Sequence, residues 1–208
     1  LVEHGAFEVQ KRLLILASHR KGFIDKKILL NLSKGEDEIA ALAITLNNDK
    51  VLEKLFSKLI NNLDHNNGHI MAASAVGILR INKDNEKART ILNDFLDVKD
   101  EETTALALDY LKSSSDLLPK NTLYKLLSHH SVNISIAALN VAGKRLDEYY
   151  LPAIISNLGN VKIAQKARTV LGIYDDMSVI DALRAQLSDN ATPLNLSIGI
   201  ARCFSSYP

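Results

Sequence analysis

The sequence predicts an all-α fold: about six antiparallel helix pairs stacked into a superhelix, with one unpaired helix at the N-terminal end. The first observation behind this prediction is a leucine that recurs in steps of 31, 33, 31, 31 and 29 residues. A self-similar period of this length is typical of stacked helical repeats; the alternative is an irregular helical bundle. We call these residues the marker leucines: Leu32, Leu63, Leu96, Leu127, Leu158 and Leu187.

The second observation is that each marker leucine precedes a short polar break and then a helix rich in small residues. Ala72 and Ala167 each fall nine residues after their marker, and Gly77 and Gly172 fall fourteen residues after theirs. Small residues on the second helix of a pair let neighbouring backbones approach, so that stacked pairs bury a continuous core. The last copy fits worst, because Leu196 stands where alanine is expected.

In the N-terminal half, polar breaks and the helical spacing of apolar residues place each helix. Acidic residues at 36–38 suit the positive N-terminal end of one helix, and Asp100 is placed to cap another. The long helix that starts at Lys50 carries its apolar residues at the spacing of one helical face. The expected helices cover 6–18, 23–32, 36–46, 50–63, 69–81, 88–96 and 101–112.

In the C-terminal half, Pro119, Pro152 and Pro193 each suit the first turn of a helix, where a missing N–H costs nothing. The expected helices cover 119–127, 132–144, 151–158, 161–174, 179–187 and 193–204. Every break is short, as helix connections in repeat arrays are. We therefore expect residues 1–208 to form a single array. Because it starts without methionine, in an unpaired helix, we also expect it to be excised from a longer protein.

The repeated pair resembles the HEAT-repeat or HEAT-like (bacterial lyase-type) α-solenoid family over nearly the whole chain. That family's second helix carries a basic residue just before the small one. Lys166 precedes Ala167 in this way, whereas Met71 and Thr104 hold the corresponding places in two other copies. The resemblance implies a right-handed, armadillo-like superhelix whose second helices line the concave side, where protein partners dock.

Composition excludes several classes of protein. Of the 208 residues, 47% are hydrophobic, enough for a large core, and the formal net charge is only +1. A nucleic-acid-binding protein usually has a basic excess, so we expect no nucleic-acid partner. The single cysteine, Cys203, cannot form an intramolecular disulfide and suits a reducing compartment, so we expect a cytoplasmic protein. No apolar run approaches about 18 residues, so we expect no membrane span in this segment.

The histidines and the cysteine are the candidates for chemistry. His65 and His69 are four residues apart, a spacing that zinc ligands use, but no third ligand completes a site. His129 and His130 are adjacent in a loop, so we expect their side chains to point in different directions. Cys203 lies in an apolar helix, which favours a small buried side chain over a reactive thiol. We therefore expect no catalytic residue, no cofactor and no metal.

A basic group near the N-terminal end, formed by Arg20, Lys21, Lys26 and Lys27, could hold a phosphate or an acidic partner. A solvated surface is the alternative explanation, and it is the one we favour.

A protein-binding surface is the functional hypothesis that the resemblance supports. Polar residues three or four apart on the second helices would form stripes that change from acidic to basic along the array. The alternative is that these residues are only the solvated side of each helix. The candidate protein-binding residues are Glu102, Asp109, Lys112, Asn133, Asn140, Lys144, Lys162, Lys166 and Thr169.

These observations predict a non-enzymatic scaffold, a HEAT-like repeat segment that docks a protein partner or a neighbouring domain of its own chain. One alternative is a soluble regulatory module of a bacterial membrane transporter. A further alternative, an enzyme, comes only from family resemblance: a HEAT-like DNA glycosylase or a phycobiliprotein lyase-type protein. The glycosylases' basic concave face and aromatic residues are not evident in a chain without tryptophan and with 5% aromatic residues.

Overall fold

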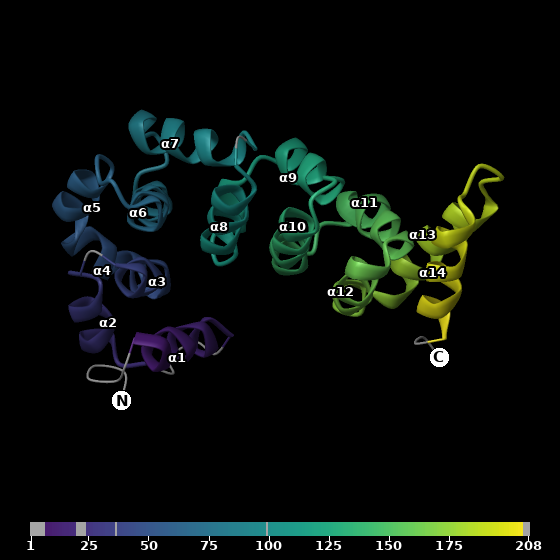
Figure 1. Cartoon of the computed structure of the whole chain (residues 1–208), viewed down its shortest axis with the longest axis horizontal. Coiled ribbons are helices and arrows are strands. Elements are labelled where there is room, and N and C mark those ends of the chain that lie inside the picture. Colours follow the sequence, from purple (N-terminus) through teal and green to yellow (C-terminus); the bar gives the residue numbers. More distant parts are fainter. Residues whose placement is uncertain (1–6, 20–23, 36, 99, 206–208) are drawn as a thin grey trace. The chain divides into compact units, whose positions relative to one another are not determined.

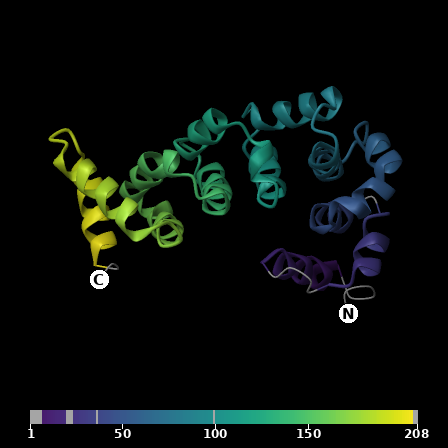
Figure 2. The same cartoon turned by 180° about the vertical axis from the view of Figure 1, so that it is seen from behind.

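A computed structural model describes residues 7–19, 24–35, 37–98 and 100–205 of the chain. In this described part the regular structure is entirely helical, with fourteen α-helices and three 3-10 turns (Figures 1 and 2). The chain forms two compact units, Leu1–Leu117 and Leu118–Pro208.

The first unit contains one unpaired helix followed by three helix pairs. Its second helices α1, α3, α6 and α8 pack in a row, each against the next, and the first helices α2, α5 and α7 pack against their partners α3, α6 and α8. The elements are α1 (Phe7–His19), α2 (Lys26–Leu32), α3 (Glu38–Leu46), α4 (Asp49–Lys54), α5 (Phe56–Asn62), α6 (Gly68–Ile81), α7 (Glu86–Leu96), α8 (Glu101–Leu111) and η1 (Ser115–Leu117).

The second unit contains three further pairs. Helix α9 pairs with α10, α11 with α12 and α13 with α14, and the second helices α10 and α12 pack directly against each other. The elements are α9 (Lys120–Leu127), α10 (Val132–Arg145), η2 (Glu148–Tyr150), α11 (Leu151–Ser156), η3 (Asn157–Gly159), α12 (Val161–Leu171), α13 (Asp176–Ser188) and α14 (Leu194–Phe204). The predicted fold class, stacked helix pairs with an unpaired helix at the start, is confirmed.

Polar caps set most helix starts. The predicted cap Asp100 accepts a hydrogen bond from the backbone N–H of Thr103 at 2.8 Å, and this bond holds the pKa of the Asp100 carboxyl below its usual value. The proline prediction is right for Pro152, which lies in the first turn of α11. It is wrong by one residue for Pro119 and Pro193, which precede the first turns of α9 and α14 at their cap positions.

Two helices that the sequence predicts as continuous are not continuous α-helices in the structure. The helix expected over 50–63 is divided at Leu55, whose backbone N–H bonds to Val51 and Leu52, and α5 starts at the next residue. The helix expected over 151–158 tightens after Ser156 into the 3-10 turn η3. Apolar spacing does not reveal such changes, because it continues through a short change of helical type.

The marker leucines lie in the core in most copies. Leu63, Leu96, Leu127 and Leu158 are at most 6% exposed, and Leu32 is half-buried. Leu187 is 42% exposed, so the marker does not hold in the last pair. There the buried leucine of α13 is Leu183, one helical turn earlier.

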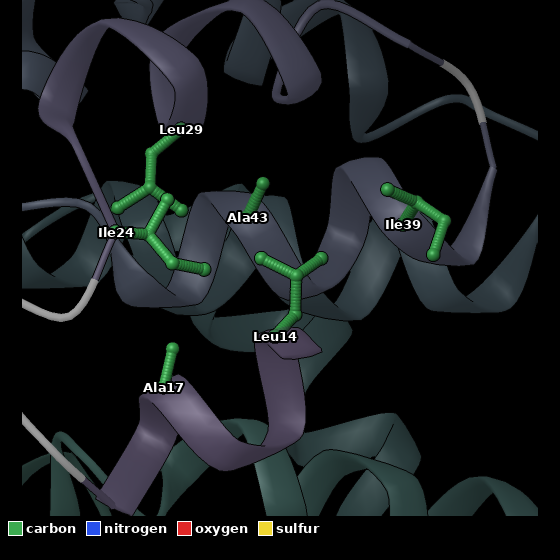
Figure 3. Close-up of a cluster of buried hydrophobic side chains, with 6 residues drawn as sticks. All are labelled: Leu14, Ala17, Ile24, Leu29, Ile39 and Ala43. Carbon is green, nitrogen blue, oxygen red and sulfur yellow. The ribbon is translucent and has the colours of Figure 1, made fainter. Parts of the chain in front are cut away.

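The core of the first unit begins between the unpaired helix and the first pair. Leu14 and Ala17 of α1 face Leu29 of α2 and Ala43 of α3, with Ile24 and Ile39 completing the cluster (Figure 3). Leu14 is fully buried. The unpaired helix is therefore held by the same kind of contact as the later second helices.

Close backbone contact positions the last pair. Helix α14 packs against η3 rather than along α12, and a Cβ atom at Gly199 would overlap the carbonyl oxygen of Leu158. Asn195 donates a hydrogen bond from Nδ2 to the Gly159 carbonyl at 2.8 Å and holds the first turn of α14 at the same place. Only glycine permits this approach, because any side chain at position 199 would meet backbone atoms.

The marker leucines provide a test of the repeat register. Leu127→Ala and Leu158→Ala should each lower the free energy of unfolding by about 2–5 kcal/mol, because each removes a buried side chain and leaves a cavity. Ala167→Asp should lower the free energy of unfolding by more, because it places a charge at a fully buried position. Leu187→Ala is the matched control and should cost about 1 kcal/mol or less. Denaturant unfolding measures all four; equal losses for Leu187 and Leu158 would contradict this assignment.

Glycine substitutions test the contact between α14 and η3. Gly199→Ala should destabilise the protein by about 2 kcal/mol or more, because Leu158 cannot move without disturbing η3. Gly172→Ala is the control: its nearest neighbour would be the Arg168 carbonyl oxygen at 3.6 Å, an ordinary contact. We expect a change of less than about 1 kcal/mol there. If thermal unfolding gave the two variants the same midpoint, the close packing of Gly199 would be wrong.

Candidate functional site

The nine candidate protein-binding residues lie on three second helices, one in the first unit and two in the second. On α8 the side chains of Glu102 and Asp109 are exposed, and Lys112, at the end of the helix, is half-buried. The expected continuation of this stripe into the second unit stays a prediction.

In the second unit the structure brings six of the candidates onto two neighbouring helices. On α10, Asn133 and Lys144 are exposed and Asn140 is half-buried. On α12, Lys162 and Thr169 are exposed and Lys166 is half-buried. We call these six residues of α10 and α12 the second-helix face.

The packing of α10 on α12 explains why these side chains share a surface. The two helices bury residues at matching intervals, Ile134, Ala138 and Val141 on α10 and Ile163, Ala167 and Val170 on α12. Gly143 brings the end of α10 close to α12, since a Cβ there would lie 3.4 Å from Val170. Residues directly before matching buried ones, such as Asn133 and Lys162, therefore take equivalent places on the two helices.

The second-helix face is basic and contains no acidic residue, because neither α10 nor α12 has an aspartate or glutamate. Within the described residues, the structure records no ion pair for Lys144, Lys162 or Lys166. The other two cations of these helices are engaged. Arg168 donates to Gln165 Oε1 at 2.6 Å, and Arg145 donates to the Leu118 carbonyl at 2.7 Å.

Apolar side chains beside this face were not singled out by the sequence. Val161, the first residue of α12, is 88% exposed, and Leu194, the first residue of α14, is 77% exposed. The hydrogen bond from Asn195 to the Gly159 carbonyl brings the starts of the two helices together. The sequence did contain a signal for them: in both helices an apolar residue directly follows the capping residue. Its side chain is exposed in both cases.

His65 and His69 each take part in a hydrogen bond. Nδ1 of His69 lies 2.9 Å from the hydroxyl of Tyr110, and Nδ1 of His65 accepts from the Asn67 N–H. In the part of the chain that the structure describes, no group of three potential metal ligands occurs. The expectation that His129 and His130 diverge is wrong: their ring centroids are 4.1 Å apart. The turn places them side by side, and His129 accepts from the Ser131 N–H.

Cys203 is a buried core residue, as its apolar helix predicted. It is 1% exposed, and burial raises the pKa of its thiol, while the Arg168 guanidinium acts weakly in the opposite direction.

Of the N-terminal basic group, Lys26 and Lys27 are exposed on α2, and Arg20 and Lys21 lie outside the described residues. No helix within the described ranges has the length and hydropathy needed to cross a bilayer.

No protein-family model matches the chain, and no curated protein matches it. Among solved structures, the chain is similar to a designed armadillo repeat protein in complex with the peptide (KR)4. The identity is 18% and the TM-score 0.37, over 100% of this chain and 88% of that chain. A superposition this loose supports no conclusion about ligands. The class of the protein is defined by its stacked helix pairs: it is an all-α helical repeat protein.

The burial of Cys203 predicts slow thiol chemistry. At pH 8, alkylation of the native protein by iodoacetamide should be at least about a hundredfold slower than in denaturant, because the folded thiol is inaccessible and its raised pKa disfavours the reactive thiolate. Mass spectrometry of timed, quenched samples measures the rate. Equal rates in the two conditions would show that the end of α14 is open.

Proposed function

We propose that this chain is a non-enzymatic scaffold that binds a protein partner, or a neighbouring domain of its own protein, through its second helices. The observation that supports this best is the pair α10 and α12. They bury small residues against each other and leave on their solvent side the second-helix face, with three cations that have no recorded ion pair.

The wider proposal is a single HEAT-like array over residues 1–208 that works in the cytoplasm. It is supported by the same helix-pair construction in both units, three pairs in each. Repeat proteins of this kind present successive equivalent helices to a partner, and contacts from several repeats add along the surface. We assign docking to the second-helix face in the second unit and, separately, to Glu102, Asp109 and Lys112 of α8 in the first unit.

The proposal is tested with the whole chain as bait in an affinity capture from lysate of the source organism, quantified by mass spectrometry. A double variant, Asn133→Tyr with Thr169→Tyr, puts bulk on exposed positions of α10 and α12 and should leave stability within about 0.5 kcal/mol. We expect the proteins captured by the unmodified chain to fall at least about fivefold with this variant, a loss of about 1 kcal/mol in binding.

The matched control places the same bulk on first helices, at Lys125→Tyr in α9 and Ala185→Tyr in α13, both exposed. Capture by this control should equal that of the unmodified chain. If the control lost the partners and the second-helix variant kept them, docking would have to be assigned to the first helices instead.

A further inference from the structure

The charges of the second unit are separated between its first and second helices. The second helices α10, α12 and α14 contain no aspartate or glutamate. Their charged residues are Lys144, Arg145, Lys162, Lys166, Arg168 and Arg202. The acidic residues of this unit all lie elsewhere, in the first helices and the connecting segments.

With the acidic residues elsewhere, Lys144, Lys162 and Lys166 have no ion pair recorded among the described residues. The ion pairs recorded among the described residues of this unit, Lys120 with Asp147 and Arg184 with Asp181, involve a first helix in each case. The Lys120 ammonium lowers the pKa of the Asp147 carboxyl. On the second-helix face, Lys162 and Lys166 lie one turn of α12 apart without such a partner.

Exposed apolar surface adjoins these cations. Val161 precedes Lys162 in the sequence, and the bond from Asn195 to the Gly159 carbonyl brings Leu194 to the same end of α12. Both side chains are more than three-quarters exposed. A large aliphatic side chain contributes to binding when a partner covers it, and a neighbouring unpaired cation adds selectivity for the partner's charge.

We propose that the second-helix face binds an acidic protein segment that also carries apolar residues. Its carboxylates pair with Lys162, Lys166 and Lys144, and its apolar side chains cover Val161 and Leu194. This inference rests on the proposed scaffold function and names the chemistry of the partner.

The composition of the surface favours such a segment over nucleic acid. Single-stranded nucleic acids are bound by aromatic side chains that stack on bases, beside cations that track the phosphates. Among the described residues of α10, α12 and α14 the one aromatic side chain is the half-buried Phe204. Aliphatic Val161 and Leu194 offer no stacking surface and suit apolar side chains of a protein.

The test uses a short fluorescein-labelled peptide that repeats Glu-Leu-Glu-Gly, and measures its fluorescence anisotropy with the whole chain. Binding should be strongest at low ionic strength and weaken as salt rises from about 50 mM to about 300 mM, because exposed charges are screened. A peptide with glutamine in place of glutamate should bind at least about tenfold more weakly.

The charge-reversal variant Lys162→Glu with Lys166→Glu should weaken binding of the acidic peptide at least about tenfold, since two attractive contacts become repulsive. The control Lys125→Glu with Arg184→Glu makes the same change in net charge on first helices and should bind as the unmodified chain does. Val161→Ser should weaken binding of the same peptide about threefold or more without changing its salt dependence. Unchanged circular dichroism shows that each variant is folded.

Four outcomes would overturn the proposal. The acidic peptide could fail to bind, or lose affinity equally in both charge variants. A labelled single-stranded DNA of similar length could bind more tightly through Lys162 and Lys166, which would assign the face to nucleic acid. Sedimentation could show a salt-sensitive dimer that the Lys162 and Lys166 variant abolishes, which would make the occupant a second copy.

The two capture experiments distinguish a failure of the scaffold proposal from a failure of the acidic-partner proposal. If lysate partners are lost with the Asn133 and Thr169 variant but kept with the Lys162 and Lys166 variant, the scaffold stands and the acidic partner is wrong. If both variants keep every partner, the second-helix face is not the docking surface at all.

Discussion

The structure depends on the close approach of backbones that small residues on the second helices allow. Each second helix after α1 packs against its own first helix, and most also pack against a neighbouring second helix, so they need contact on several sides. Alanine and glycine meet this need because they let helix axes come together without leaving voids. Ala167 is fully buried in α12, and Gly199 lies against the backbone of η3. A larger side chain at either place would force two pairs apart.

Packing on several sides also determines which residues of the second helices stay exposed and can bind a partner. The burial of one side of α10 and α12 confines their polar residues to the other, which becomes the second-helix face. Buried Asn157 hydrogen-bonds to backbone inside the stack: it donates from Nδ2 to the carbonyls of Leu127 and Ala153, both at 2.9 Å. The first of these bonds joins neighbouring pairs and satisfies a carbonyl at the end of α9. The lysines of the second-helix face, by contrast, have no recorded ion pair within the stack, which is consistent with a role in binding a partner.

The expected helices agree with the structure closely, and the differences have physical causes. The period of the marker leucines holds through Leu158 because those residues fill equivalent places between pairs. It fails at Leu187, which is exposed on α13 in the last pair, where Leu183 is the buried leucine. Of the candidate site, the sequence predicted the residues of each stripe from helical spacing. It missed Val161 and Leu194, because an apolar residue near a helix start is normally expected to face the core.

By itself, the sequence determined the all-α class, the paired helices and most of the core, because helical spacing, polar breaks and small residues are local properties of the chain. Only the tertiary structure decided which residues meet across pairs: that α10 lies on α12, that Gly199 meets the Leu158 carbonyl, and that His129 and His130 lie ring to ring. The same holds for the unpaired state of Lys162 and Lys166. Whether a lysine forms an ion pair with a carboxylate on a neighbouring helix depends on the packing angle of the two helices. The repeat period of the sequence does not encode that angle.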